Sequence, residues 1–363
     1  MRIARFSHNG SVSYGLVLGP DQLGGAGRGA AGGTAGEAAD GKGKASGAVS
    51  ANGSGAKGSG GNGSGVNSPG IGNGSATAGA TAGASGTAGT PGPAGTSGAA
   101  GTPGPAGTSG PPEPSGPAGP AADQLMVAQL AGHPFGGRAE DIKLTGIRFP
   151  LADVRLLAPI LPSKVVCIGR NYAEHAREMG TEPPEEPVIF LKPSTAVSGP
   201  GDPVVRPTGL TERVDYEGEL AVVIGRLCRQ VPAERIPEVI FGYTCANDVT
   251  ARDLQARDGQ WTRAKGFDTF CPLGPWIQTD LDPADLELST RINGEVRQHS
   301  RTSLMLHGVP ALIMVVSQVM TLLPGDVLLT GTPAGVGPMS KGDQVSVTIE
   351  GIGTLTNPVT DRD

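Results

Sequence analysis

Short apolar runs rich in β-branched residues recur through the second half of the chain, each bounded by Gly, Pro or Asp. Runs of this length and composition predict β-strands. We expect strands at 164–169, 188–193, 219–225, 241–248, 286–294, 326–331 and 344–355. Helical patterns are fewer, near 173, near 232 and over the apolar stretch from Val309. This pattern predicts a β-rich α+β fold.

The N-terminal 19 residues alternate apolar and polar positions around His8-Asn9-Gly10, which predicts a β-hairpin. Residues 142–160 are typical of mixed strand and turn. We therefore expect a small N-terminal β subdomain formed by 1–23 and 123–160, followed by a larger domain over 161–363.

Residues 24–122 form a low-complexity tract without Leu, Met, Cys or any aromatic residue, so they cannot build an apolar core. From Gly83 to Ala121, Gly occupies every third position except near Glu113, and GTPGPAGTSG occurs twice. This spacing is collagen-like, which is compatible with a trimerising stalk. The short, interrupted run favours a disordered insertion instead, tolerated because the entropic cost of closing a loop grows only logarithmically with its length.

Composition excludes several classes of function. The formal net charge is −6 with both signs mixed, so we expect no nucleic-acid binding. The start of the chain lacks an apolar signal region and the stretch from Val309 is too short to span a bilayer, which predicts a cytoplasmic protein without membrane contact. The cysteines are far apart and form no CxxC pair, which predicts reduced, mostly buried thiols. They are Cys167, Cys228, Cys245 and Cys271.

Three carboxylates in two neighbouring strand-like runs are candidate metal ligands. In VDYEGELAVVIG, Glu217 and Glu219 point to one face of a strand, and Asp248 ends the next run. If the strands are adjacent, three oxygen donors converge, which favours Mg²⁺ or Mn²⁺ over Zn²⁺. Spacing alone also allows a solvated strand end. Asp215 shares the alternation, and the pattern assigns it no role.

A second candidate group is the pair His175 and Glu178, three residues apart on one side of a predicted helical turn. A carboxylate fixes the tautomer of a histidine and raises its basicity, which suits proton abstraction; a solvated surface helix is the alternative. Lys192 and Lys265 are cations flanked by apolar or aromatic residues, suited either to an anionic substrate or to snorkelling. GTPAGVG at 331–337 lacks the ending of a nucleotide P-loop but fits a nest of backbone N–H groups for a carboxylate.

Several of these motifs together resemble one known family. The similar segments are KVVCIGRNYAEHAREMG, PVIFLKPSTAVSGPGD, VDYEGELAVVIG, FGYTCANDVTARDLQ, QWTRAKGFDTFCPLGPW and LLPGDVLLTGTPAGVGPM. They resemble the fumarylacetoacetate hydrolase family, in its branch of small acylpyruvate hydrolases, oxaloacetate decarboxylases and hydroxyheptadienedioate isomerases. The likeness extends from Ser163 to Val359, and the His307-Gly308 pair departs from it.

The resemblance implies mixed β-sheets rolled into a distorted barrel, a homodimer and a catalytic domain over 161–363 with Mg²⁺ or Mn²⁺ at the barrel mouth. Carried over residue by residue, it implies metal ligands Glu217, Glu219 and Asp248, catalytic residues His175, Glu178 and Lys265, and substrate contacts from Arg170, Lys192 and Thr332.

The activity implied is metal-stabilised enolate chemistry on a keto-acid substrate in the catabolism of aromatic compounds. Acylpyruvate hydrolysis or isomerisation of 2-hydroxyhepta-2,4-diene-1,7-dioate is expected, with oxaloacetate decarboxylation or tautomerisation as the alternative. From other classes, a structural or adhesive protein that uses the collagen-like tract and a catalytically silent binding protein stay open.

Overall fold

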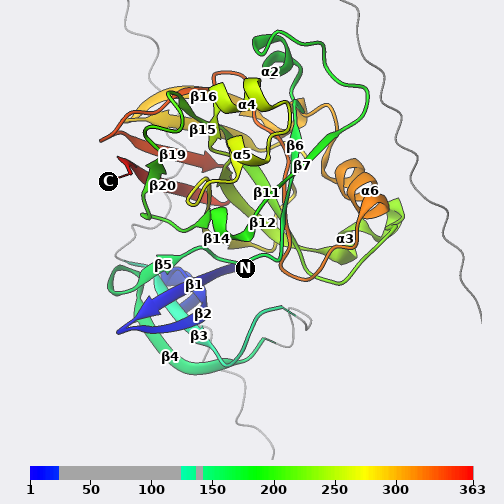
Figure 1. The fold of residues 1–363 in the computed structure, drawn as a ribbon. Helices are drawn as coiled ribbons and strands as arrows, with labels where there is room; N and C mark the ends of the chain where they lie inside the picture. The colour runs from blue at the N-terminus through cyan, green and yellow to red at the C-terminus, as the bar shows by residue number, and fades with distance from the viewer. Residues whose placement is uncertain (24–123, 136–141, 363) are drawn as a thin grey trace, which may run out of the picture. The chain divides into compact units, whose positions relative to one another are not determined.

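The computed structural model describes residues 1–23, 124–135 and 142–362, which all belong to one compact unit. The insertion predicted over 24–122 lies outside these residues. Within them the fold is mostly β with few helices, as the sequence predicts (Figure 1).

The largest sheet has 12 strands of mixed direction. Along its path lie β4 (Leu144–Pro150), β3 (Met126–Leu130), β2 (Ser11–Leu18), β1 (Arg2–His8), β14 (Cys271–Gln278), β12 (Ile240–Asn247), β11 (Gly218–Ile224), β17 (Val327–Leu329), β6 (Val165–Gly169) and β7 (Val188–Lys192). Off the path, β5 (Arg155–Leu157) pairs with β1 and β8 (Val197–Ser198) with β14. In the described part of the chain this path is open from β4 to β7, so a closed barrel is not found.

Two smaller sheets accompany it. One contains β16 (Glu295–Arg301), β15 (Glu287–Ile292), β19 (Gln344–Ile349), β20 (Gly353–Asp361) and β9 (Val204–Arg206); the other contains β13 (Thr250–Ala251), β10 (Val214–Tyr216) and β18 (Gly337–Pro338). The α-helices are α1 (Pro20–Leu23), α2 (Ala173–Glu178), α3 (Ile236–Val239), α4 (Arg252–Asp258), α5 (Thr262–Lys265) and α6 (Val309–Val319). Single 3₁₀ turns are η3 (Leu151–Asp153), η4 (Ser194–Ala196), η5 (Ala233–Arg235) and η6 (Thr302–Leu304). None of the described helices is long and apolar enough to cross a membrane.

The predicted N-terminal hairpin is confirmed. β1 and β2 pair from Arg2 to His8, and Asn9 and Gly10 both have positive φ, the geometry that a two-residue hairpin loop requires. The strands of this region have their own small apolar cluster around Phe6 and Val127. They are nevertheless continuous with the rest of the molecule, because Arg2 and Ile3 of β1 pair with β14.

β11 is the central strand that positions the site, and every residue in it is buried. Its alternate side chains enter two apolar clusters, Leu220, Val222 and Ile224 one, and Ala221 and Val223 the other. The first cluster also contains residues of α6 and of the five-stranded sheet. A strand covered on both faces reads as a continuous apolar run, which is why its sequence shows no alternation.

Two predicted runs are each divided in the structure. The run at 344–355 forms β19 and part of β20 around a turn. The run at 214–225 forms β10 and β11, which belong to different sheets and meet at Glu217. Glu217 leaves both ladders because its N–H donates to Asn247 Oδ1 at 2.9 Å and its carbonyl accepts from Asp248 N at 2.8 Å.

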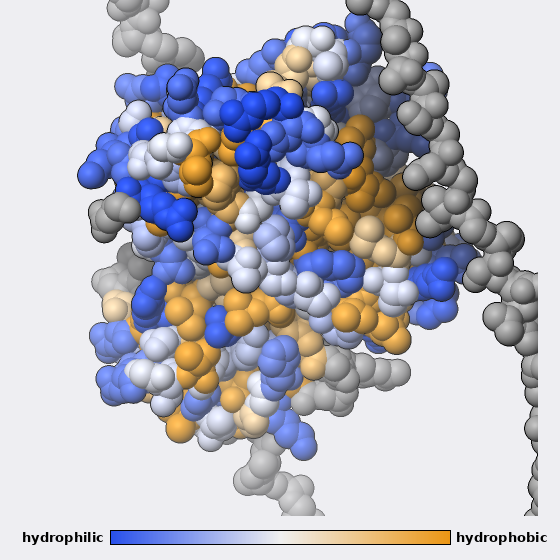
Figure 2. Space-filling model, in the orientation of Figure 1, coloured by the Kyte–Doolittle hydropathy of each residue, from blue (hydrophilic) through white to orange (hydrophobic). Residues whose placement is uncertain are grey.

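All four cysteines are free, and all but Cys228 are buried, as the sequence predicts. On the face shown in Figure 2, apolar surface gathers over β7 and α6. The exposed side chains of Leu191 and Val319 belong to these two elements.

Candidate functional site

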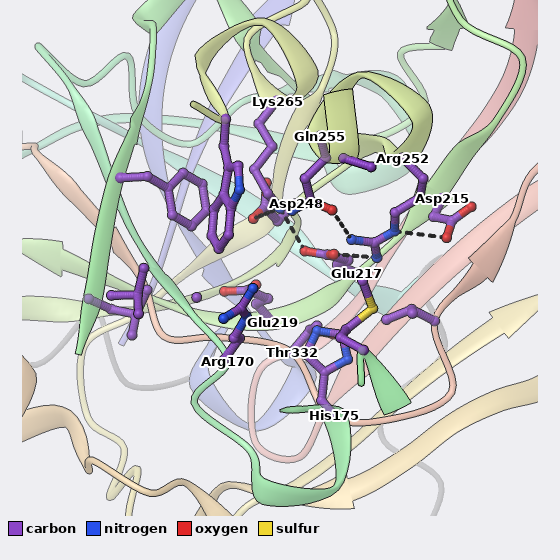
Figure 3. Close-up of a pocket in the computed structure, with 18 of the residues that line it drawn as sticks. Arg170, His175, Asp215, Glu217, Glu219, Asp248, Arg252, Gln255, Lys265 and Thr332 are labelled. Carbon is purple, nitrogen blue, oxygen red and sulfur yellow. Dashed lines mark hydrogen bonds and ion pairs between the residues drawn. The ribbon is translucent and has the colours of Figure 1, made fainter. Parts of the chain in front are cut away.

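A cavity of about 810 Å³ opens between α2, β7, α4, α5 and the junction of β10 with β11. In the close-up of Figure 3, a group of acidic side chains lies between Lys265 on one side and His175 on the other. The residues of interest that line it are Arg170, His175, Glu178, Arg213, Asp215, Glu217, Glu219, Asp248, Arg252, Gln255, Trp261, Lys265 and Thr332.

Glu217, Glu219 and Asp248 converge, with ligand oxygens all within 4.8 Å of one another, and all three are buried. Strand register explains this. Gly218 and Glu219 pair with Asn247 and Ala246, so Asp248 emerges from β12 directly beside Glu217. Burial of three carboxylates in one place is costly unless cations accompany them.

Two buried lysines supply part of that charge. Lys265 Nζ donates to Glu217 Oε2 at 2.9 Å, Asp248 Oδ2 at 2.7 Å and Thr250 Oγ1 at 2.7 Å. Lys192 Nζ donates to Asp248 Oδ1 at 2.5 Å and to the Val249 carbonyl. Lys192 itself does not line the cavity, whereas Val188, Ile189 and Phe190 of the same strand do, so the predicted substrate contact of Lys192 stays a prediction.

Arg252 and Asp215 extend the network to a fourth carboxylate. Arg252 lies within 2.5 Å of Glu217 Oε1 through one guanidinium nitrogen, donates to Gln255 through another and donates to Asp215 Oδ2 through Nε (Figure 3). Asp215 is fully buried and also accepts two hydrogen bonds from Arg213. Asp215, to which the sequence pattern assigns no role, therefore holds Arg252, the arginine that contacts Glu217.

The two glutamates respond differently to this environment. Burial disfavours the charged form of Glu217, but Arg252 and Lys265 outweigh it and hold the pKa of Glu217 well below its ordinary value. Burial, together with Asp248 and Glu217, raises the pKa of Glu219 well above the ordinary range. Among the described residues no salt bridge reaches Glu219, and its carboxylate accepts a hydrogen bond from the Gly331 N–H at 2.6 Å.

This donor set fits a divalent cation. The three groups offer only oxygen ligands, which Mg²⁺ and Mn²⁺ prefer over sites built from His or Cys. Glu219 is a buried carboxylate beside two others without a cation of its own, so positive charge placed among them would compensate it.

His175 and Glu178 of α2 lie at the cavity with their side chains in contact. His175 Nδ1 is 3.1 Å from Glu178 Oε2, and the histidine is 5% exposed. The other oxygen of Glu178 accepts from Gly335 N at 3.0 Å, which ties α2 to the glycine-rich loop at 331–337. The loop predicted to bind a carboxylate through its backbone N–H groups therefore binds one of the protein's own, that of Glu178.

Arg170 and Thr332 also line the cavity. Arg170 has a positive φ of 58°, unusual for a residue other than glycine, and its guanidinium carbon lies 5.7 Å from the centre of the Trp261 ring. No described carboxylate forms an ion pair with it. The Thr332 hydroxyl donates to the Gly218 carbonyl and accepts from Gln298.

The sequence reasoning missed Arg252, Gln255 and Trp261. A signal was present for the first two, since they follow Asp248 closely and are spaced three apart, which places them on one side of a helix. Trp261 lacked such a signal because its place against Gly169 depends on the packing of α5 beside β7.

Comparison with known proteins decides the family. The model of the fumarylacetoacetate (FAA) hydrolase C-terminal domain matches residues 164–360. The chain belongs to the fumarylacetoacetate hydrolase family. A second model, described as Rv2993c-like, N-terminal, matches residues 110–159.

Curated relatives of this fumarylacetoacetate hydrolase family member share much of its length. Protein Rv2993c of Mycobacterium tuberculosis is 62% identical over 239 residues, which cover 65% of this chain and 88% of the relative. Oxaloacetate tautomerase YisK of Bacillus subtilis is 44% identical over 231 residues, 60% of this chain and 77% of the relative.

Two solved structures of the family are also similar. The 2-hydroxyhepta-2,4-diene-1,7-dioate isomerase of Mycobacterium marinum is 58% identical with a TM-score of 0.61, covering 66% of this chain and 90% of its own. Maleylpyruvate hydrolase of Sphingobium sp. SYK-6, solved with manganese(II) and pyruvate, is 39% identical with a TM-score of 0.53, covering 61% of this chain and 78% of its own. Family members therefore carry hydrolase, isomerase and tautomerase names.

Proposed function

We propose that this protein is a divalent-metal-dependent hydrolase that cleaves a C–C bond in acylpyruvates bearing a second carboxylate. The observation that carries the proposal is the opening of one cavity onto both a buried three-carboxylate group and a His–Glu pair. Mg²⁺ or Mn²⁺ held by Glu217, Glu219 and Asp248 would stabilise negative charge developing on the 2-oxo acid. The manganese and pyruvate in the Sphingobium hydrolase support this assignment.

His175 is the proposed base. Because a carboxylate only accepts hydrogen bonds, Nδ1 carries the proton shared with Glu178, and Nε2 is left with a free lone pair. Nε2 takes a proton from water while the water oxygen bonds to the distal carbonyl carbon. The C–C bond to the pyruvate fragment then breaks, its electron pair forms the enolate, and the proton returns from His175 to that carbon. The products are pyruvate and a carboxylic acid.

Arg170 is the proposed partner of the second carboxylate. The other cations in or beneath the cavity, Lys192, Lys265, Arg213 and Arg252, are all engaged by Asp or Glu side chains. Arg170 instead lies over the face of Trp261, where its guanidinium is held without neutralisation. A planar guanidinium recognises a carboxylate through two parallel hydrogen bonds, which favours a dicarboxylate substrate.

A second candidate activity uses the same residues without attack by water. Moving a proton between carbon and oxygen of a 2-hydroxydienoate or of oxaloacetate needs only His175 and stabilisation of the same enolate. The names of the Mycobacterium marinum and Bacillus subtilis relatives favour this alternative.

A panel of four substrates tests the proposal: fumarylpyruvate, acetylpyruvate, oxaloacetate and 2-hydroxyhepta-2,4-diene-1,7-dioate, each with Mg²⁺, Mn²⁺ or EDTA. The expected result is release of pyruvate and fumarate from fumarylpyruvate that EDTA abolishes. Release of pyruvate and carbon dioxide from oxaloacetate alone would indicate a decarboxylase and contradict the proposed hydrolysis. Loss of enol absorbance without pyruvate or carbon dioxide would instead support the isomerase. Pyruvate release that is unaffected by EDTA would contradict the role of the metal.

A further inference from the structure

A chain of hydrogen bonds joins the strand that leads into Glu217 to the His175–Glu178 pair. Tyr216, the last residue of β10, is 4% exposed, and its hydroxyl donates to the Gly335 carbonyl at 2.9 Å. The Gly335 N–H donates to Glu178 Oε1 at 3.0 Å, and Glu178 Oε2 lies 3.1 Å from His175 Nδ1. The carbonyl and the N–H of Gly335 thus both take part in the connection from Tyr216 to His175.

The position of Gly335 is sterically restricted, which makes it a defined anchor. Its φ is +98°, and a Cβ there would lie 2.2 Å from the Arg297 carbonyl oxygen. Only glycine combines this backbone with so close an approach to β16. On its other side, β18 pairs with β10 so that Gly337 is opposite Tyr216. The register of β10 against β18 therefore places the Tyr216 hydroxyl beside the loop at 331–337.

Glu178 depends on such an anchor because it receives little other support. Its side chain is 33% exposed, and α2 has only six residues, too few for a helix to be stable without tertiary contacts. The Gly335 N–H fixes one carboxylate oxygen, and this directs the other oxygen to His175. A carboxylate free to rotate would orient the imidazole less well.

We propose that Tyr216 is a positioning residue of this enzyme, acting through Gly335 and Glu178 on His175. The inference rests on the proposed function only in taking His175 as the group that moves the proton. It also gives β10 a second task. This three-residue strand positions the candidate metal ligand Glu217 that follows it, and through Tyr216 it supports the His175–Glu178 pair.

Tyr216→Phe, which removes only the hydroxyl, tests the proposal in turnover. We expect kcat for acylpyruvate hydrolysis to fall about fivefold, the ratio corresponding to one hydrogen bond, with KM and Mn²⁺ affinity unchanged. In a Glu178→Ala background the same substitution should have no further effect on kcat, because the path through Glu178 is already lost. Equal losses in both backgrounds, or no loss in either, would overturn the proposal.

Tyr243→Phe is the matched control. Tyr243 is also a buried tyrosine, but it belongs to β12 and lines a separate cavity formed with Ile236, Leu281 and Met305. We expect Tyr243→Phe, which also removes only a hydroxyl, to leave kcat unchanged.

Amide hydrogen exchange gives a reading that does not depend on any substrate. Tyr216→Phe should accelerate exchange of the Gly335 amide and of α2 about fivefold, and Tyr243→Phe should not. Gly335→Ala, which displaces the same donor, should reproduce the acceleration. If the wild-type protein turned over none of the four substrates, the proposed function would fail, and exchange would still decide the role of Tyr216. Exchange at the wild-type rate in Tyr216→Phe would reject that role, whatever the result for Gly335→Ala.

Discussion

The carboxylate group and the His–Glu pair face the same cavity but are held by opposite means. Glu217, Glu219 and Asp248 are buried, fixed by the register of β11 against β12, and surrounded by Lys192, Lys265 and Arg252. The pair depends on a six-residue helix, a partly exposed carboxylate and one backbone donor.

The difference indicates how tasks are divided. A site for a small, doubly charged ion gains from fixed charge in a medium of low dielectric constant, and this requires buried groups that compensate one another. A group that moves protons must meet water and substrate, and regions that admit ligands are drawn from the less stable parts of a fold. The comparison predicts large stability effects at the first region and effects confined to turnover at the second.

The sharpest contrast lies within the carboxylate group. Glu217→Gln should lower the free energy of unfolding of the metal-free protein by about 3 kcal/mol, because Arg252 and Lys265 would lose a buried anion. Glu219→Gln should change it by less than about 1 kcal/mol, since no described cation pairs with Glu219. Both should weaken Mn²⁺ binding by at least about 100-fold. Urea unfolding and calorimetry measure these quantities; equal destabilisation would remove the distinction between the two glutamates.

At the second region, His175→Ala should reduce kcat for the preferred substrate about 10²- to 10⁴-fold while leaving Mn²⁺ affinity and urea unfolding near those of the wild type. The matched control is His299→Ala, because His299 also contacts a glutamate at 3.1 Å but is exposed on β16. A full loss of Mn²⁺ affinity in His175→Ala would show that the two regions are not separable.

Arg170 tests whether the cavity recognises a second carboxylate. Arg170→Leu should raise KM for fumarylpyruvate about 10- to 100-fold, the cost of a charge-assisted hydrogen bond, and change KM for the monocarboxylate acetylpyruvate little. Arg177→Leu on the exposed side of α2 makes the same change in net charge outside the cavity and should change neither. A parallel rise in KM for both substrates would refute the assignment.

The smallest expected effect is in the pH dependence of stability without metal. The folded-state pKa of Glu219 is raised, so above the ordinary glutamate value of 4.5 the unfolded chain releases its proton first. Stability therefore falls as pH rises from 4.5 toward the raised pKa, which thermal unfolding in EDTA should register as a decrease in Tm. Glu219→Gln should lack this decrease. If the Tm of Glu219→Gln fell equally with rising pH, the decrease would have to come from other titratable groups.

Much of the site could be anticipated because its residues lie in short, contiguous patterns. Alternation placed Glu217 beside Glu219, and the three-residue spacing of His175 and Glu178 placed both on one side of a turn. Asp215 shows the limit of such reasoning: alternation set its direction and Arg213 is a local partner, but its second partner Arg252 belongs to α4, which only tertiary packing brings to it.

The sequence by itself determined the strand content, the N-terminal hairpin and the residue types of the site, because these depend on local periodicity and turn chemistry. Tertiary structure decided that the run from Val214 to Ile224 changes sheets at Glu217, that Lys192 lies beneath Asp248 and outside the cavity, and that Tyr216 reaches Gly335. These facts depend on which strands become neighbours and in which register. No local pattern encodes that choice, since it is set by the burial of apolar faces and the pairing of charges between segments far apart in the chain.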